Sequence, residues 1–207
     1  MQKECVTVFD STLIRSPFTG HHAESQPNRQ GQVQVHVNAQ VLPSVTLIST
    51  WVRGEAKLAE ALTQALQVSI PQVTGKTVQC ALGLLMRTGP QEWMLIGSTN
   101  QDAQATLRSH IHSEVGSITD LSHARCQIHV SGTKAKEALG KLFALDFRNA
   151  AFALNDIALT GHHHVPCTVH RLGEQSFDLY VFSTYAFGQL ESLIDASREF
   201  GVELSLN

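Results

Sequence analysis

The sequence predicts an α+β fold made of two tandem β-α-β-β-α units, in which antiparallel sheets carry helices on one face. The first observation is that strand-like and helix-like segments occur in the same order in the two halves of the 207 residues. The second is a match between GPQEWMLIGST, from Gly89, and GEQSFDLYVFST, from Gly173, once one residue of slack is allowed. The third is that Gly54 and Gly132 occupy the same junction between a strand and a helix.

The first half begins with a polar segment and two strands. Residues 21–31, HHAESQPNRQG, contain Pro and Gly among polar residues, which predicts a loop or a mobile arm. The alternating QVQVHV from Gln32 predicts a half-buried strand, and the β-branched and aromatic VTLISTWV, residues 45–52, predicts a second one. After Arg53 and Gly54, AKLAEALTQAL places its apolar residues on one stripe of a helix.

The remaining segments follow the same plan twice. TVQCALGLLM and EWMLIG are expected to be strands around the turn RTGPQ, followed by a helix at about 101–112. In the second half RCQIHVSG is a strand, KAKEALGKLF a short helix, VPCTVHRL and SFDLYVF strands around GEQ, and FGQLESLIDASREFG a helix. This order is the kernel of a ferredoxin-like fold. It divides the chain into an N-terminal arm with the first strand or strands (1–44), a first α+β unit (45–118) and a second one (119–207), with an exchange of strands between the units left open.

Composition and charge exclude several classes of protein. Apolar residues make up 43% and charged residues 16% of the chain, and the formal charge is -3 with Lys and Arg scattered along the sequence. Nucleic acid is therefore not an expected partner. The low share of charged residues favours a chain that buries part of its exterior against other proteins. Because the N-terminus lacks an apolar core of signal-peptide length and no apolar run reaches 18 residues, secretion and contact with a membrane are not expected.

The cysteines indicate a reducing compartment. The four of them, Cys5, Cys80, Cys126 and Cys167, stand at least 41 residues apart, so the sequence has no C-x-x-C metal or redox motif. We therefore expect reduced thiols and a cytoplasmic location.

The stretch TDLSHAR, residues 119–125, brings Asp120, Ser122 and His123, the residue types of a catalytic triad, close together in sequence. If the strand RCQIHVSG begins a few residues earlier, Ser122 and His123 lie on opposite faces of it. A nucleophile needs its base within about 3 Å, so a hydrolase triad is not expected. Asp120 and Ser122 are instead expected to bond nearby backbone N–H groups. His123 and Arg125 are expected on a polar face, as candidate interface residues.

A histidine-rich stretch in the second half raises the question of a metal site. In GHHHVPCTVH, residues 161–170, strand alternation places His162, His164 and His170 on one face. No further ligand is identified for a structural or catalytic zinc site, so a solvated strand face is expected, with a histidine-based metal protein as a weaker alternative. The sequence has no P-loop, no G-x-G-x-x-G after a strand and no H-E-x-x-H. We expect no catalytic residue, cofactor or metal in this chain.

Six short motifs, in order, carry a resemblance to a known family. They are Arg53-Gly54, Gly89-Pro90-Gln91-Glu92-Trp93-Met94-Leu95, Ser122-His123-Ala124-Arg125, Ser131-Gly132, Leu145-Asp146 and Ser183. Through them the chain resembles the gamma subunit of heterotetrameric sarcosine oxidase along about 160 of its residues. It departs from the family pattern at Phe182, where an Arg usually precedes the Ser, and in the polar arm before position 32.

The resemblance implies an architecture related to the aminomethyltransferase (T-protein) family and membership of a complex. In that complex the alpha, beta and delta subunits carry FAD, FMN, NAD, tetrahydrofolate and zinc, and the gamma subunit has no cofactor. The complex would demethylate sarcosine oxidatively to glycine and pass the one-carbon unit to tetrahydrofolate. The chain itself would be a structural subunit without an active site. Trp93, Phe177 and Tyr180 are expected to pack at the two repeated hairpins.

The same fold leaves one alternative from a different class, a free-standing folate-binding or one-carbon-transfer protein. Such a protein needs a pocket with a carboxylate that grips the pterin. The available acids are Asp146, Asp156 and Glu92, and the sequence does not single out one of them.

Overall fold

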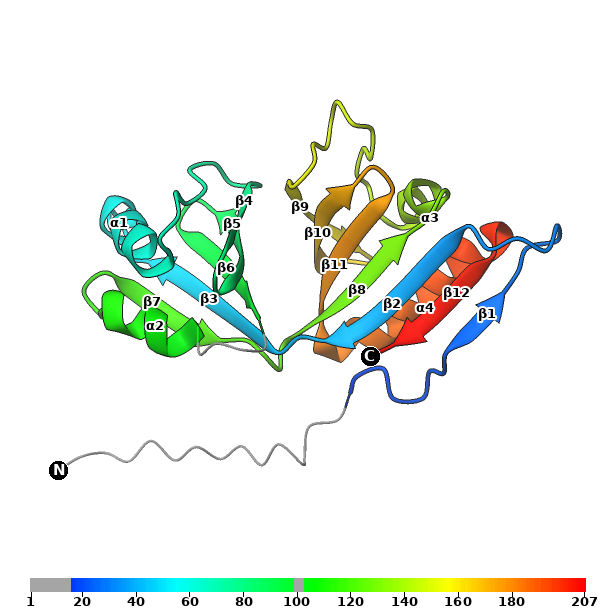
Figure 1. Cartoon of the computed structure of the whole chain (residues 1–207), viewed down its shortest axis with the longest axis horizontal. Helices are drawn as coiled ribbons and strands as arrows, with labels where there is room; N and C mark the ends of the chain where they lie inside the picture. The colour runs from blue at the N-terminus through cyan, green and yellow to red at the C-terminus, as the bar shows by residue number, and fades with distance from the viewer. Residues whose placement is uncertain (1–15, 99–102) are drawn as a thin grey trace.

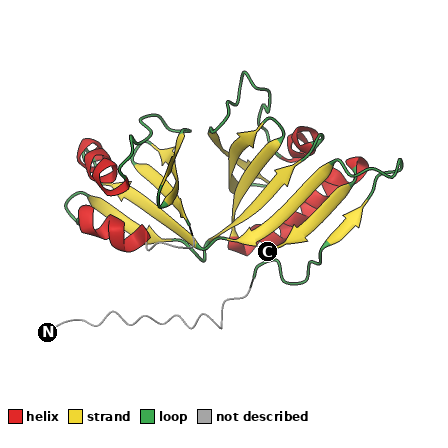
Figure 2. Ribbon diagram, viewed as in Figure 1, coloured by secondary structure: helices red, strands yellow, loops and turns green. Residues whose placement is uncertain are grey.

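The computed structural model describes residues 16–98 and 103–207 and contains two β-sheets that lie next to each other, each with its own helices (Figure 1). The α+β fold is confirmed, as are its largely antiparallel sheets. In each unit the helices cover the face of the sheet that points away from the neighbouring unit (Figure 2). The other face of each sheet is turned toward the space between the units.

The smaller unit contains a five-stranded sheet of order β4-β5-β6-β3-β7 and two helices. Its elements are β3 (Ser44–Thr50), α1 (Glu55–Leu66), β4 (Thr77–Cys80), β5 (Gly83–Gly89), β6 (Glu92–Gly97), α2 (Ala103–His110) and β7 (Gly116–Asp120). The two helices pack against one face of this sheet. The core between them includes Leu58, Leu62, Leu85, Trp93 and Leu107. The predicted helix at 101–112 is thus present as α2, and its first two predicted residues lie outside the described ranges.

The larger unit contains a seven-stranded sheet of order β1-β12-β2-β8-β11-β10-β9. Its elements are β1 (Glu24–Gln26), β2 (Val35–Val41), β8 (Arg125–Ser131), α3 (Ala135–Leu142), β9 (Ile157–His162), β10 (Val165–Gly173), β11 (Ser176–Phe182), α4 (Ala186–Ser197) and β12 (Val202–Leu206). Helices α3 and α4 pack on one face over a core that includes Val37, Ile128, Leu139, Phe177 and Leu190.

Each unit repeats one order of elements, β3-α1-β4-β5-β6-α2-β7 and β8-α3-β9-β10-β11-α4-β12. The predicted β-α-β-β-α plan is therefore present twice. In each unit an additional strand, β4 or β9, follows the first helix, and another, β7 or β12, follows the second helix. Strand β2 lies between β12 and β8 and pairs in parallel with β12. The predicted boundary at 118/119 falls within β7, which belongs to the smaller sheet, while residues 35–41 belong to the larger one.

One predicted strand, residues 77–86, is two strands. The chain reverses between β4 and β5, where Gly83 has a φ of +138°. A Cβ atom at Gly83 would lie 2.0 Å from the carbonyl oxygen of Ile96, so only glycine fits this close approach of two backbones. The apolar run hides the reversal because both strands bury part of their side chains.

The match between the segments at Gly89 and Gly173 corresponds to the same hairpin in both units. In each hairpin the pairing register shifts just before the turn, at Arg87 to Gly89 and at Arg171 to Gly173. The arginine Nε donates to the carbonyl oxygen of that glycine over 3.3 Å and 3.0 Å, respectively. Each guanidinium also lies over an aromatic ring of the next strand, Trp93 at 4.8 Å and Phe177 at 5.9 Å from the ring centroid. The two hairpins are stabilised by equivalent contacts.

The cysteines of the described ranges are buried free thiols at positions 80, 126 and 167, and Cys5 lies outside those ranges. Burial raises the pKa of the Cys167 thiol to about 12, because the thiolate would lose its hydration. Among residues 16–98 and 103–207, no helix has the length and apolar character that crossing a membrane requires.

Candidate functional site

The two units are joined at one end by a short backbone and ion-pair contact. Lys76 Nζ lies 2.7 Å from both carboxylate oxygens of Asp156. The N–H of Ile157 donates to the carbonyl oxygen of Gly75 over 2.8 Å, and the Thr77 hydroxyl donates to Asn155 O over 2.7 Å. These bonds bring the start of β4, in the smaller sheet, into contact with the start of β9, in the larger sheet.

An apolar cluster continues this contact between the two sheets. It contains Met86, Met94 and Ile96 from the smaller sheet and Ile157 and Tyr180 from the larger one, all at most 9% exposed. Burial of these side chains removes apolar surface from water on both units and thereby stabilises their relative placement.

A cavity of about 450 Å³ lies beside this cluster, between the units. Its wall includes Gly83 and Ser98 from the smaller unit and Asn155, His170 and Asp178 from the larger one. Pockets of this volume hold small molecules when their walls offer a few polar groups among apolar ones. We take this cleft as the candidate functional site.

A buried carboxylate is the centre of the polar groups at the cleft. Asp178, on β11, is 5% exposed, and its Oδ1 lies 2.8 Å from Nδ1 of His129 on β8. The Tyr180 hydroxyl donates to its Oδ2 over 3.4 Å. Burial, and then the charge and hydrogen bond of Asp178, raise the pKa of Tyr180 well above 10.0, so the phenol stays protonated and can donate.

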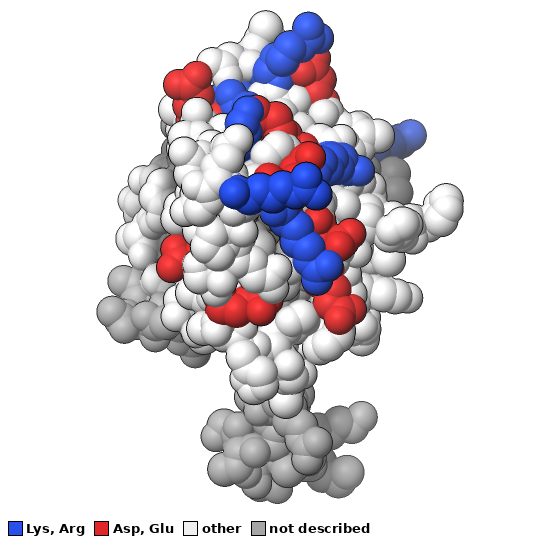
Figure 3. Space-filling model, turned by 90° about the vertical axis from the view of Figure 1, so that its right-hand side faces the viewer, with Lys and Arg blue, Asp and Glu red and all other residues white. Residues whose placement is uncertain are grey.

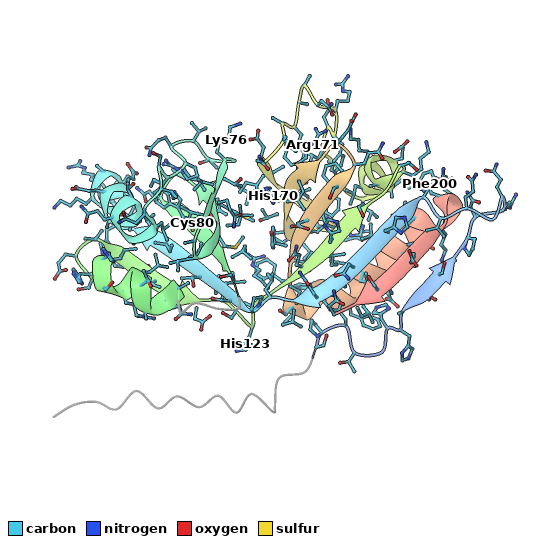
Figure 4. The ribbon with its side chains drawn as sticks, viewed as in Figure 1. Lys76, Cys80, His123, His170, Arg171 and Phe200 are labelled. Carbon is cyan, nitrogen blue, oxygen red and sulfur yellow. The ribbon has the colours of Figure 1, made fainter. Side chains whose placement is uncertain are left out.

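His170, on β10, faces the same cleft (Figure 4). It is 2% exposed, and neither ring nitrogen has a hydrogen-bond partner within the described part of the chain. Burial lowers the pKa of His170, against the opposing charges of Asp178 and Asp156, because the imidazolium would lose its hydration. The cleft therefore offers a neutral imidazole and a buried carboxylate side by side.

The lowered pKa of His170 predicts a stability that falls in mild acid. The unfolded chain binds a proton at His170 near the ordinary pKa of about 6.5, whereas the folded chain binds it only at lower pH. The contribution is fully present above about pH 6.5 and is lost as the pH falls through the folded pKa. We expect urea unfolding of the wild type to lose more free energy between pH 7.5 and pH 5 than unfolding of His170→Asn. Equal losses in the two proteins would contradict this assignment.

The histidine-rich stretch does not place three histidines on one face, contrary to the prediction. His163 and His164 form the turn between β9 and β10, with φ values of 48° and 65°. His162 is 6% exposed and its ring lies 6.0 Å from that of Phe143 on the helix side, while His170 faces the cleft. The turn reverses the chain, so residues before and after it do not alternate as one strand. Within the described ranges, no group of three or more His, Cys, Asp or Glu residues is arranged to hold a metal ion.

TDLSHAR joins the two units rather than beginning β8. Residues 121–124 form a turn between β7 and β8, so the assumed extension of the strand is wrong. The expected backbone bonds are confirmed: Ser122 N–H donates to Asp120 Oδ1 over 2.9 Å, and Val45 N–H donates to Ser122 Oγ over 3.0 Å. The Ser122 hydroxyl also donates to Asp120 Oδ1 over 2.6 Å. The Ser122 hydroxyl therefore both accepts and donates a hydrogen bond within this turn and its neighbouring strand.

The other two residues of this stretch differ in their surroundings. His123 is exposed at the base of the space between the units (Figure 4). Arg125 is half-buried, and its guanidinium carbon lies 3.5 Å from the ring centroid of Phe182 on the neighbouring strand. Burial lowers the pKa of Arg125. The aromatic at 182, where the related family usually has Arg, is thus the surface on which Arg125 stacks. A role of His123 or Arg125 at a subunit interface stays a prediction.

Two of the motifs, Arg53-Gly54 and the turn that begins at Gly89, lie together at one end of the smaller sheet. Arg53 has a φ of 66° in the connection from β3 to α1, and a Cβ at Gly54 would lie 2.3 Å from Thr50 Oγ1. The N–H of Thr50 donates to the carbonyl oxygen of Gln91, within the turn Gly89-Pro90-Gln91-Glu92. The motif at this end therefore shapes two adjacent turns.

The remaining predicted residues have separate structural roles. Glu92 accepts a hydrogen bond of 2.7 Å from the Thr88 hydroxyl, and Trp93 is 1% exposed in the core. Gly132 has a φ of +117° beside the backbone of Gln34. Asp146 is paired with Arg148 on the surface, whose hydrogen bonds lower the pKa of Asp146 to about 2.

Sequence reasoning missed the polar groups of the cleft. Asp178 interrupts the apolar segment SFDLYVF, and an acid inside such a segment is a signal of a buried, paired carboxylate. Its contact with His129 could not be found from spacing, because it depends on the pairing register of β11 with β8.

The fold and its family model define the class of protein. A model described as the GCVT N-terminal domain matches residues 72–205. The glycine cleavage system aminomethyltransferase T from Bartonella henselae has a similar structure, with a TM-score of 0.61 and 16% identity over 84% of this chain and 48% of that one. The chain thus has an aminomethyltransferase-like fold.

Proteins with higher sequence identity to the chain identify its family within this class. Sarcosine oxidase subunit gamma of Corynebacterium sp. (strain P-1) is 29% identical over 95% of this chain and 97% of its own, and that of Arthrobacter sp is 30% identical over 94% and 95%. Heterotetrameric sarcosine oxidase from Corynebacterium sp. U-96, in complex with pyrrole 2-carboxylate, contains a chain with a TM-score of 0.72 and 27% identity over 80% of this chain and 85% of that one. The chain belongs to the sarcosine oxidase gamma-subunit family, which confirms the resemblance predicted from the sequence.

Proposed function

We propose that this chain is the gamma subunit of a heterotetrameric sarcosine oxidase and acts as a structural component of that flavoenzyme. The observation that carries the proposal is the similarity to curated gamma subunits over 94% or more of both chains. The similar solved structure is a heterotetrameric sarcosine oxidase, which supports an assembly with other subunits.

In this proposal the complex demethylates sarcosine oxidatively to glycine and transfers the one-carbon unit to tetrahydrofolate. FAD, FMN, NAD, tetrahydrofolate and zinc are bound by the alpha, beta and delta subunits, and the complex is cytoplasmic. The engagement of Ser122 in the turn supports a structural role for this chain, because its hydroxyl donates to Asp120 and accepts from Val45. A structural subunit contributes by holding larger subunits in place.

The test is co-expression of the chain with the alpha, beta and delta subunits. We expect a tag on the beta subunit to retain this chain, and we expect the isolated chain to be colourless and without sarcosine oxidase activity. Omission of the chain should lower the yield of assembled complex. Flavin absorbance or sarcosine turnover by the isolated chain would overturn the structural role, and a chain that is never retained would overturn membership of the complex.

A second candidate function, folate binding by the lone chain, is favoured by the carboxylate in the cleft. None of the three acids that the sequence offered lines the cavity. Asp146 pairs with Arg148, Asp156 with Lys76, and Glu92 with Thr88. Asp178 lines the cavity instead. Titration with tetrahydrofolate, followed by Trp fluorescence, separates the two functions. Micromolar saturable binding that is lost in Asp178→Asn favours folate binding, and no binding by the wild type removes this candidate.

A further inference from the structure

One face of the larger sheet is polar but carries few charges. Strand alternation turns Val35, Val37 and Ala39 of β2 toward the helices, and the residues between them point to the opposite face. We call the part of this face on β2, on β12 and on residues 127–131 of β8 the polar strip. It consists of His36, Asn38, Gln40, Gln127, His129, Ser131, Glu203 and Ser205. Arg125, the first residue of β8, lies on the same face beside the strip and stacks on Phe182.

The side chains of the polar strip bond to one another across the strands. Gln40 Nε2 donates to Gln127 Oε1 over 2.8 Å, and Asn38 Nδ2 donates to Ser205 Oγ over 2.8 Å. His36 Nδ1 lies 2.9 Å from Glu203 Oε2. These bonds hold the side chains in place across the strands. Each amide has more donors and acceptors than they use, so the strip keeps hydrogen-bonding capacity for a partner.

The distribution of charge separates the polar strip from the helix side of the same unit. Glu203 is the single acid of the strip, and Lys and Arg are absent from it. Basic and acidic side chains are intermixed on the side of the molecule that Figure 3 shows. On α3 and α4 and the residues next to them, Lys134 pairs with Glu137, Lys141 with Glu199 and Arg198 with Asp195. The centres of protein interfaces are depleted in charged residues, whereas charged faces are typical of solvated surface. In its low share of charged residues the strip resembles a surface that is covered.

The polar strip is accessible and hollowed. The side chains of His36 and Glu203 are 51% and 56% exposed. A hollow of about 330 Å³ lies over β2 and β12, with Asn38, His129 and Ser205 in its wall. Amide, hydroxyl and imidazole groups at strand spacing match the N–H and C=O groups of another polypeptide, and they offer no cation for a phosphate.

We propose that the polar strip is the surface on which another subunit of the complex docks, through a polypeptide segment that is uncharged and hydrogen-bonding. This inference rests on the proposed function and deepens it by naming the surface and the chemistry of its partner. An acidic segment is disfavoured because it would face Glu203, and a basic one would meet a single acid that is already paired with His36. An uncharged segment complements an uncharged strip.

The test uses the complete complex with charge-adding variants of this chain. Ser205→Lys and Gln40→Lys each place an ammonium on the strip, and Gly140→Lys is the matched control, because Gly140 is exposed on α3 with open space around it. We expect each strip variant to reduce the amount of chain retained by a tagged beta subunit about tenfold or more, because an unpaired charge would be buried. We expect no change for Gly140→Lys. Retention of both strip variants at the wild-type level overturns the inference.

A measurement on the wild type makes the result independent of folding defects in the variants. Carbethoxylation of His36 by diethylpyrocarbonate, followed by mass spectrometry, is expected to slow at least tenfold in the complex relative to the isolated chain. An unchanged rate of His36 modification overturns the inference. If the tagged beta subunit still retains the wild-type chain, the proposed function stands. A wild-type chain that is not retained overturns both. A dimer of the isolated chain that Ser205→Lys converts to monomer would assign the strip to a second copy and would also overturn the inference.

Discussion

Gly132→Ala is expected to destabilise the protein by about 3 to 5 kcal/mol, a sum of left-handed backbone strain and overpacking. Gly132 has a φ of +117° at the end of β8, and a Cβ there would lie 2.3 Å from the carbonyl oxygen of Gln34. That oxygen accepts the N–H of Lys134, at the start of α3, so the clash cannot be relieved without moving the connection. Since domains of this size are stable by about 5 to 15 kcal/mol, a large part of the total is lost. Urea unfolding of the isolated chain measures the difference.

Gly140→Ala is the matched control for this prediction. Gly140 lies inside α3, and a Cβ there meets no atom within 4 Å. Alanine in a helix is favoured over glycine by about 0.5 to 1 kcal/mol, so this variant should be slightly more stable than the wild type. Equal effects of alanine at the two positions would show that the close approach at Gly132 is not the cause.

Trp93→Ala is expected to cost about 3 to 5 kcal/mol, as is usual when a large buried aromatic is removed. Trp93 is 1% exposed in the core of the smaller unit and lies under the guanidinium of Arg87. Its indole N–H has no hydrogen-bond partner among the described residues, so Trp93→Phe, which keeps a ring and removes that donor, should cost clearly less than the alanine variant. Urea unfolding monitored by far-UV circular dichroism compares them.

Trp51→Ala provides the second matched control. Trp51 is 52% exposed and donates its indole N–H to Ser113 O over 2.6 Å. Its replacement removes one hydrogen bond and only part of the burial that is lost at Trp93, so the expected cost is about 1 to 2 kcal/mol. A loss at Trp51 as large as that at Trp93 would contradict the burial argument.

The repeated plan could be predicted because it depends on local pattern. Strand alternation and the helical stripes are set by neighbouring residues, and the match between Gly89 and Gly173 follows from the same hairpin at Arg87 and Arg171. The closing strands β7 and β12, the strand β9 and the short β1 were not predicted. They are short, at five, five, six and three residues, and single-sequence patterns of that length are weak.

The candidate site was less accessible to sequence reasoning than the fold. Asp120 and Ser122 form a local motif, and their backbone bonds followed from residue type alone. Asp178, His129 and His170 come from three strands, and which side chains meet depends on the order and register of the sheet. The separation of His162 from His170 likewise depends on a turn that spacing does not show.

The position of β2 in the larger sheet delays the completion of that sheet during synthesis. β2 is made early, but both of its neighbours, β8 and β12, come later, and its pairing of Val35 with Val202 spans most of the sequence. On a ribosome the strands of the smaller unit are complete once residue 120 has emerged, whereas β2 keeps an unpaired edge until the last strand leaves the exit tunnel. The larger unit therefore completes its sheet only after β12 has emerged, well after the smaller unit is complete.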